Sequence, residues 1–275
     1  MKLKSKLLIL LFTLALLCGA FVLMTSAATE TPVTAADLAD KWNAAEDGDT
    51  LTLSEDITYT GETLTLASGK TLTLDLGGHT LTGGDAALIS SAGTLTVKNG
   101  KIVMGSASAV AATGGNLTLE VLTVTNTATD DSYPMAMVSI DKTVAVMNNV
   151  YISGKTQIAL WISGGSTVTA DNITVRNTVL PITKETGRVA IQVNGNNTVT
   201  LTNSLVESVY TGIRFANNNE NNDATKNTFL FKDSTLNVTF KNNIEGTNLD
   251  SKTYSGGDIY KIVADQVAHV TLTLD

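Results

Sequence analysis

The sequence is poor in the residues on which many functional sites depend. Its only cysteine is Cys18 and its only histidines are His79 and His269, which excludes the ligand spacing of zinc sites. Aromatic residues make up 5% of the chain, and neither a serine triad nor a phosphate-binding glycine loop is present. The sequence therefore indicates no catalytic residue, no metal ligand and no cofactor.

Positive charge is also scarce. Lys and Arg number 18 against 26 Asp and Glu, which gives a formal net charge of −8. Such a chain offers no basic surface for phosphate backbones, so we do not expect a nucleic acid as its partner. The excess of acids favours a soluble, well-hydrated exterior.

The first 27 residues have the pattern of a secretory signal peptide. Three lysines among the first six residues precede an apolar run over 7–24, and the small residues at 25–28 offer a cleavage site. An uncleaved anchor is the alternative, because the run approaches a membrane-spanning length. We therefore predict a signal peptide at 1–27 and a secreted or cell-surface location.

One amphipathic helix is expected after this segment. Thr34 and Asp37 fit a helix N-cap with an acidic residue at N3, and Leu38 and Trp42 follow at helical spacing. The pattern predicts a short helix within 34–47. Such a helix would cover the open end of the repeated structure that follows it.

From residue 48 onward, short segments alternate apolar residues with threonine or other polar residues. This alternation is typical of strands that bury one face. One short sequence pattern, here called the phrase, recurs along the chain with steps of 22, 27, 24, 31 and 30 residues. Its copies begin at Leu95, Leu117, Val144, Val168, Val199 and Phe229. Most copies have a partner strand before them and a corner rich in glycine or asparagine between the two. The period predicts an all-β fold, a right-handed parallel β-helix of roughly 9–10 coils over 48–275.

An asparagine or aspartate ends most copies of the phrase. Stacked about 4.8 Å apart from coil to coil, these side chains can hydrogen-bond along the axis as a ladder. Ordinary turn residues are the alternative. The predicted structural ladder consists of Asn99, Asn148, Asn172, Asn203 and Asp233.

Two stretches near the start of the solenoid carry a family resemblance. They are Glu46-Asp-Gly-Asp-Thr-Leu-Thr-Leu-Ser-Glu-Asp-Ile57 and Gly69-Lys-Thr-Leu-Thr-Leu-Asp-Leu-Gly-Gly-His-Thr-Leu-Thr-Gly83. Both resemble the opening coils of pectate-lyase-like right-handed β-helix proteins, in particular secreted, surface-associated members from Gram-positive bacteria. The resemblance implies the fold for nearly the whole chain after residue 27. It implies no single activity, because this superfamily includes polysaccharide lyases, hydrolases and adhesins.

The acidic and basic residues of this sequence can be compared with those that the catalytic members of the superfamily require. For a lyase, the resemblance implies clustered carboxylates that hold calcium and an arginine or lysine base. The residues that would fit are scattered along the chain: Asp171, Glu207, Asp233, Arg176, Arg188 and Arg214. A hydrolase would need two carboxylates roughly 5–10 Å apart, and adjacent coils offer Asp141 and Asp171.

Three loops depart from the repeat, at 126–134, 176–188 and 217–227. Insertions in a solenoid usually carry binding, so we expect the first two to wall a shallow groove for an extended glycan. Solvated excursions are the alternative. Trp161 is a second candidate, as a stacking platform for sugar. The predicted groove residues are Asp130, Asp131, Tyr133, Arg176, Lys184, Arg188 and Tyr210.

Paired threonines with one residue between them also recur, for example at 71/73 and 94/96. A flat and regular threonine array can order water and bind ice. Such an array requires evenly spaced coils, and the uneven repeat lengths argue against it.

The chain stops inside an alternating strand, Val270 to Leu274. Because an open strand edge invites pairing, we expect self-association or a downstream domain there. Taken together, the sequence predicts a secreted β-helix that recognises an extracellular polysaccharide or cell-surface glycan without catalysis. The alternative is a lyase or hydrolase of acidic polysaccharide, for which calcium would be the cofactor.

Overall fold

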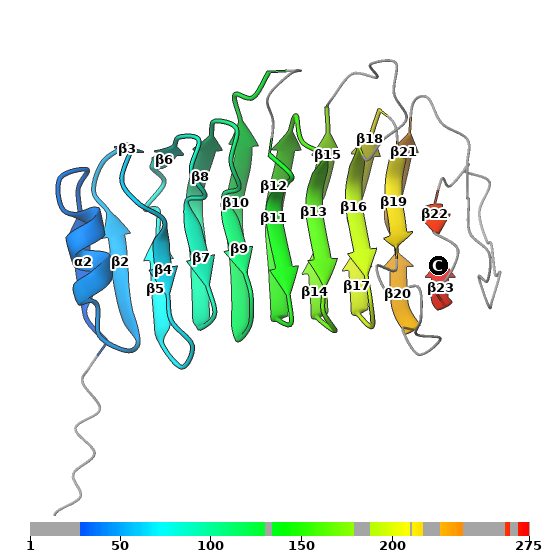
Figure 1. Ribbon diagram of the computed structural model, residues 1–275, viewed down its shortest axis with the longest axis horizontal. Helices are drawn as coiled ribbons and strands as arrows, with labels where there is room; N and C mark the ends of the chain where they lie inside the picture. The colour runs from blue at the N-terminus through cyan, green and yellow to red at the C-terminus, as the bar shows by residue number, and fades with distance from the viewer. Residues whose placement is uncertain are drawn as a thin grey trace, which may run out of the picture.

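The computed structural model describes residues 28–129, 134–178, 188–209, 211–216 and 226–238, together with the strands at 262–264 and 269–274. The strands lie side by side along one long axis, and the chain advances along this axis from coil to coil (Figure 1). Neighbouring strands pair in parallel throughout the described structure. The predicted all-β parallel β-helix with one short helix is thereby confirmed.

One sheet contains 15 strands arranged in two rows. The first row comprises β1 (Glu30–Val33), β2 (Asp49–Leu53), β5 (Thr71–Asp75), β8 (Thr94–Met104), β10 (Asn116–Asn126), β12 (Val144–Gly154), β14 (Thr167–Asp171), β17 (Thr198–Thr202), β20 (Lys226–Lys232) and β23 (His269–Leu274). The second row adds β3 (Ile57–Tyr59), β6 (Thr80–Gly83), β15 (Thr174–Asn177), β18 (Leu205–Ser208) and β21 (Thr235–Val238). The long strands β8, β10 and β12 take part in both rows, so the two rows meet at a corner in each coil.

The other sheet has eight strands and closes the coil. In order along the axis its strands are β4 (Leu64–Leu66), β7 (Ile89–Ser91), β9 (Val110–Ala112), β11 (Ala136–Asp141), β13 (Ile158–Ser163), β16 (Val189–Asn194), β19 (Thr211–Ala216) and β22 (Ile262–Ala264).

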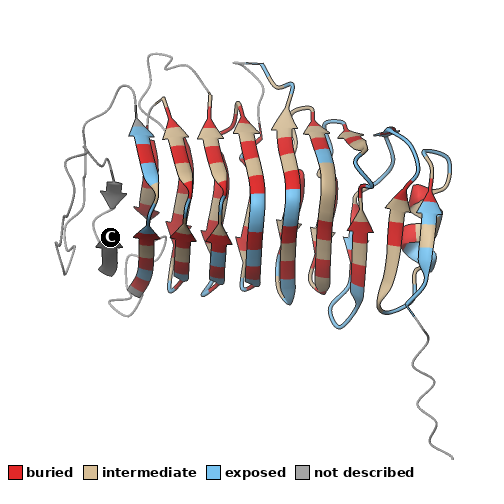
Figure 2. Ribbon diagram, turned by 180° about the vertical axis from the view of Figure 1, so that it is seen from behind, coloured by how far each residue is buried: buried red, intermediate tan, exposed pale blue. Residues whose placement is uncertain are grey.

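The hydrophobic core fills the space between the sheets from Val33 to Leu236. Buried and more exposed positions alternate along most strands and align from one strand to the next (Figure 2). Small inward residues such as Ala145 and Ala170 alternate with larger ones such as Met147 and Leu201, which is how layers interdigitate. Near the C-terminal coils the rings of Phe215 and Phe229 meet edge to face, with centroids 5.4 Å apart. Burial of these stacked side chains is the main source of stability.

The helix α2 (Leu38–Ala44) covers the N-terminal end of the stack (Figure 1). Leu38 and Trp42 are buried, and the indole Nε1 of Trp42 donates to the Thr65 carbonyl at 3.0 Å. The backbone N–H of Thr34 donates to the Asp37 carboxylate at 2.7 Å, but the N-cap of the helix is Asp37 itself rather than the predicted Thr34, so this hydrogen bond lies in the turn before the helix. Hydrogen bonds from Lys41 and Thr34 lower the pKa of Asp37 to about 2. The helix therefore lies inside the predicted range of 34–47.

In each coil from β8 to β21, one residue in the left-handed conformation turns the chain between the two rows. The residues with this conformation are Asn99, Val121, Asn149, Asn172, Asn203 and Asp233, with φ between 47° and 57°. Asparagine and aspartate tolerate this region better than other residues with a side chain. The structure thus places Asn149 at the corner, whereas Asn148 belongs to β12 and pairs with Glu120 and Asp171.

The shift by one residue has a physical reason. Because Val144 and Val146 are apolar, the sequence alignment of the repeats places them at inward positions. In the structure both point outward, with 52% and 47% of their surface exposed. Ala145 and Met147 take the inward positions instead. Because side chains alternate between faces, a slip of one residue exchanges the two faces of a strand.

Hydrogen bonds between corner side chains join coils only in short runs. The Asn172 amide donates to Asn149 at 2.6 Å, whereas the Asn203 amide donates to Asp171 at 2.8 Å. Val121 has no polar group and separates Asn99 from Asn149. A continuous asparagine ladder is therefore absent from the described corners.

A second and buried ladder lies at the corner between the eight-stranded sheet and the first row. Its members are Thr143, Ser166, Asn197 and Asn227, each no more than 1% exposed. The Asn197 side chain accepts from the Ser166 backbone N–H at 2.9 Å, and Asn227 accepts from the Asn197 backbone N–H at 2.9 Å. Sequence reasoning placed Ser166 and Asn197 at corners and Asn227 in the loop at 217–227, because nothing in their composition shows that the side chains turn inward.

Candidate functional site

The eight-stranded sheet presents a column of polar and aromatic side chains on its outer surface. Ser139, Trp161, Gln192 and Arg214 are in register on β11, β13, β16 and β19. Strands in a sheet are about 4.8 Å apart, so an indole, an amide and a guanidinium lie on successive coils. The indole N–H of Trp161 is buried, which leaves ring carbons as the accessible part of this side chain.

The neighbouring outward positions on this sheet differ in burial. Met137, Ala159 and Ala190 follow the same outward alternation but are at most 1% exposed. Trp161 therefore lies at the margin of a covered part of the sheet. On the other side of the column, Asp141 accepts a hydrogen bond from the Ser163 hydroxyl at 2.8 Å.

The carboxylates considered for hydrolysis lie on different sheets. Asp141 belongs to β11 of the eight-stranded sheet, and Asp171 ends β14 in the first row. Hydrogen bonds from Thr202 and Asn203 lower the pKa of Asp171. A general acid in glycoside hydrolysis needs its pKa raised, so the environment of Asp171 acts in the opposite direction.

The structure describes two of the seven residues predicted to line the groove. Asp130, Asp131, Tyr133, Lys184 and Tyr210 lie outside the described residues. Arg176 is on β15 in the second row, whereas Arg188 directly precedes β16 in the eight-stranded sheet. These two arginines are thus carried by different sheets. The third predicted loop, 217–227, lies outside the described residues except for Lys226 and Asn227 at the start of β20.

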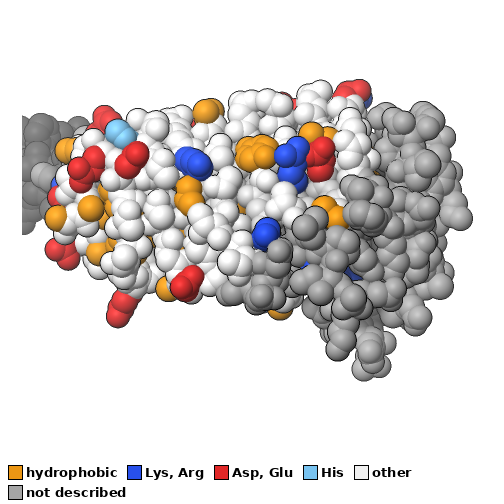
Figure 3. Space-filling view, turned by 90° about the horizontal axis from the view of Figure 1, so that it is seen from above, with side chains coloured by type: hydrophobic (Ala, Val, Ile, Leu, Met, Phe, Trp, Pro, Cys, Tyr) orange, Lys and Arg blue, Asp and Glu red, His pale blue; other side chains and the backbone are white. Residues whose placement is uncertain are grey.

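Arg176 is held by an acidic partner on the next coil. Its Nε donates to the Glu207 carboxylate at 2.5 Å, and this hydrogen bond raises the pKa of Arg176. The pair lines a shallow hollow of about 270 Å³ together with Asn237, whose amide donates to Glu207 at 3.4 Å. In the part of the upper side that the structure describes, the basic side chains lie apart from one another (Figure 3).

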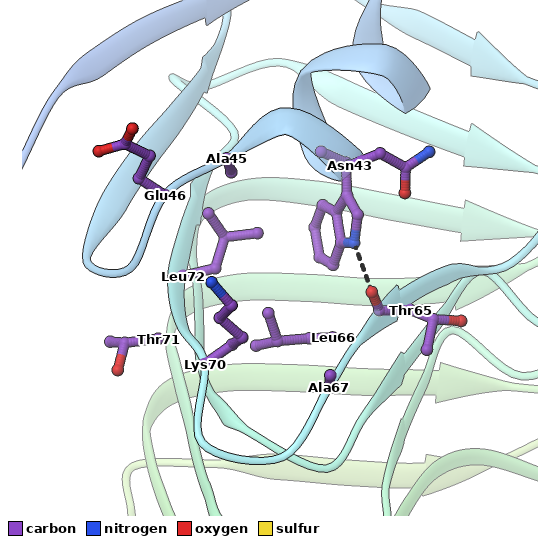
Figure 4. Close-up of a pocket in the computed structure, with 10 residues that line it drawn as sticks. Asn43, Ala45, Glu46, Thr65, Leu66, Ala67, Lys70, Thr71 and Leu72 are labelled. Atoms are coloured by element: carbon purple, nitrogen blue, oxygen red, sulfur yellow. Dashed lines mark hydrogen bonds between the residues drawn. The ribbon is translucent and has the colours of Figure 1, made fainter.

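A smaller cavity, of about 170 Å³, lies beneath α2 (Figure 4). The indole of Trp42 and the side chains of Leu66 and Leu72 form its apolar part, with Lys70 and Glu46 also lining it. The hydrogen bond from Trp42 to Thr65 joins the helix to the wall of this cavity. We assign the space to packing of the helix on the first coils.

The described residues contain no group of three or more His, Cys, Asp or Glu side chains arranged to hold a metal ion. Within the same part of the chain, no helix has the length and apolar character needed to cross a membrane. No family model matches the chain, and no curated protein is significantly similar to it. The class is therefore defined by the fold, which is an all-β parallel β-helix with one short helix.

Proposed function

We propose that this protein is a secreted or cell-surface β-helix that binds an extracellular polysaccharide without cleaving it. The observation that carries this proposal is the column of Trp161, Gln192 and Arg214 on one outer surface. A ring face packs on the C–H face of a sugar, while amide and guanidinium groups hydrogen-bond to hydroxyl or carboxylate oxygens.

The geometry of the column suits an extended ligand. Three recognition groups on three successive strands form a line along the helix axis rather than a closed pocket. A chain of sugars can contact such a line with several residues at once, and several weak contacts add to a useful affinity. The acidic residue nearest in this sheet, Asp141, is already engaged by Ser163.

The cellular location and the family form part of the same proposal. The basic start, apolar run and small residues of 1–27 support export. The corners rich in left-handed asparagine and the helix over the first coil support membership of the pectate-lyase-like superfamily.

Retention on immobilised pectic, alginate-like and neutral polysaccharides tests the proposal, with calcium present and with new reducing ends measured in parallel. We expect retention without new ends, and we expect Trp161→Ala to weaken it about tenfold or more, which corresponds to about 1.4 kcal/mol. Tyr151→Ala is the matched control, because Tyr151 is an outward aromatic residue on β12 in the second row. The appearance of new reducing ends would show that the protein cleaves the polysaccharide, which contradicts the proposal. An equal loss of retention in Trp161→Ala and Tyr151→Ala would show that the column is not the binding site.

A further inference from the structure

The first row carries a second surface with a different chemistry, which we name the threonine face. It consists of two outward columns in register over seven successive strands. The columns are Thr71, Thr94, Asn116, Val144, Thr167, Thr198 and Thr228, and Thr73, Thr96, Thr118, Val146, Thr169, Thr200 and Leu230.

The spacing within this face is regular although the repeats differ in length. Each member pairs directly with the member on the next strand, without a slip, from Thr71 to Thr228. The separation is therefore about 4.8 Å between strands and about 6.6 Å between the two columns along a strand. The extra residues of longer repeats lie in other parts of the coil, such as the segment between β15 and β16. The expectation that uneven repeats would spoil the array is thus wrong for this face.

Strand propensity alone does not account for the composition of the face. The second row has the same backbone geometry, yet its outward positions include Lys101, Tyr151 and Arg176. Neither column of the threonine face contains a charged or aromatic side chain. Charged side chains border the face on both sides: Lys98 pairs with Asp75 at 3.3 Å beyond one column, and Lys142 lies two residues before Val144 beyond the other.

The side chains of the face are also held in place and open to water. Threonine and valine are branched at Cβ, so the backbone restricts their χ1 angle and fixes methyl and hydroxyl groups in rows. Within the described structure, the hydroxyls of Thr96, Thr118 and Thr169 make no hydrogen bond to protein. Val144 and Val146 keep the branched shape at the centre of the array, without a hydroxyl.

We propose that the threonine face binds ice. Its rows of hydroxyl and methyl groups hold a layer of water at regular positions, with a repeat near that of the oxygen layers in ice. Such a layer joins a growing ice surface without rearrangement, because its order is set beforehand by the rigid sheet. Soluble sugars are a poorer match, since the face has no ring for stacking and no charged group for hydroxyl recognition. This inference does not rest on the polysaccharide proposal, which concerns the other sheet.

The test is the growth of a single ice crystal in a solution of the purified protein, followed by partition of the protein between ice and liquid. We expect a faceted crystal, a gap between its melting and growth temperatures, and enrichment of the protein in the ice. Thr96→Lys and Thr169→Lys place a hydrated charge in the array, and each should reduce the gap at least about fivefold.

Thr123→Lys and Thr174→Lys are the matched controls, because both threonines point outward from the second row. Each should leave the gap within about a third of the wild-type value, and circular dichroism of all four variants checks the fold. Round crystals with the wild-type protein, or an equal loss in face and control variants, would overturn the proposal. Dimerisation through the face would also overturn it, and sedimentation of the wild type and Thr169→Lys would reveal it.

Discussion

The threonine face and the outer surface of the eight-stranded sheet are built from the same coils but differ in regularity. On the face, Thr96, Thr118 and Val146 follow one another in register with one kind of side-chain shape. On the other sheet, Ser139, Trp161 and Gln192 occupy equivalent positions with three different chemistries. Both surfaces have parallel strands, so backbone geometry does not cause the difference.

The difference follows from where the coils accept extra residues. The segments after β10 and β15 lead into the eight-stranded sheet and vary in length, whereas from β8 to β21 the corner between the two rows turns on one left-handed residue in each coil. Segments of varying length beside the eight-stranded sheet bring different contacts to its margin. Corners of constant length keep the threonine face regular from coil to coil. A parallel β-helix can therefore carry an irregular recognition surface and a regular one on the same molecule.

The largest effect on stability is expected in the buried ladder, at the corner between the eight-stranded sheet and the first row. Asn197→Ala would leave the buried Ser166 N–H without its acceptor and the Asn194 carbonyl without a donor. We expect a loss of about 2–3 kcal/mol in the free energy of unfolding, measured by urea denaturation. Asn196→Ala, at an exposed position of the same corner, should stay within about 0.5 kcal/mol of wild type. Equal effects would mean that the buried ladder adds no stability.

The second prediction concerns the independence of the two surfaces, which is tested by measuring each variant in both the polysaccharide and the ice assay. Trp161→Ala should weaken polysaccharide retention about tenfold, or about 1.4 kcal/mol, and leave ice growth unchanged. Thr169→Lys should do the reverse, because the two residues lie on different sheets. If either variant changes both readouts while its melting curve is unchanged, the surfaces do not act independently.

A smaller effect is expected at the corner that keeps the threonine face in register. Val121 is a β-branched residue at φ 48°, and 52% of its surface is exposed. Val121→Asn should raise the free energy of unfolding by about 1 kcal/mol, since asparagine tolerates this conformation and little buried surface is lost. Val103→Asn, at an outward position on β8 with ordinary strand geometry, serves as the control. A destabilised Val121→Asn protein would contradict this explanation.

The smallest effect concerns the helix that covers the first coil. The pKa of Asp37 is about 2 in the folded protein, below its ordinary value of 3.8, so its ionised form stabilises the fold above about pH 4. This contribution is lost as the pH falls through 3.8 and then 2. Thermal unfolding of Asp37→Asn should therefore differ from wild type at pH 7 and converge with it near pH 2. If the difference in unfolding temperature between Asp37→Asn and wild type did not change with pH, the charge of the Asp37 carboxylate would not be its cause.

The class of fold, the helix at its start and most strands could be predicted from the amino-acid sequence. The alternation of apolar residues with threonine is a local signal, and its return at 22 to 31 residues left few alternatives to a solenoid. The helix was equally readable, because Thr34 and Asp37 lie close in sequence and form their hydrogen bond locally.

Tertiary structure alone decided which side chains meet between coils. Register placed Asn149 rather than Asn148 at the corner, and it turned Asn197 into a buried acceptor. Register also aligned Thr96 with Thr118 despite unequal repeats. These contacts join residues more than 20 positions apart, and the pairing of whole strands fixes them. Local composition carries no record of that pairing, because an outward valine and an inward valine look the same in a sequence.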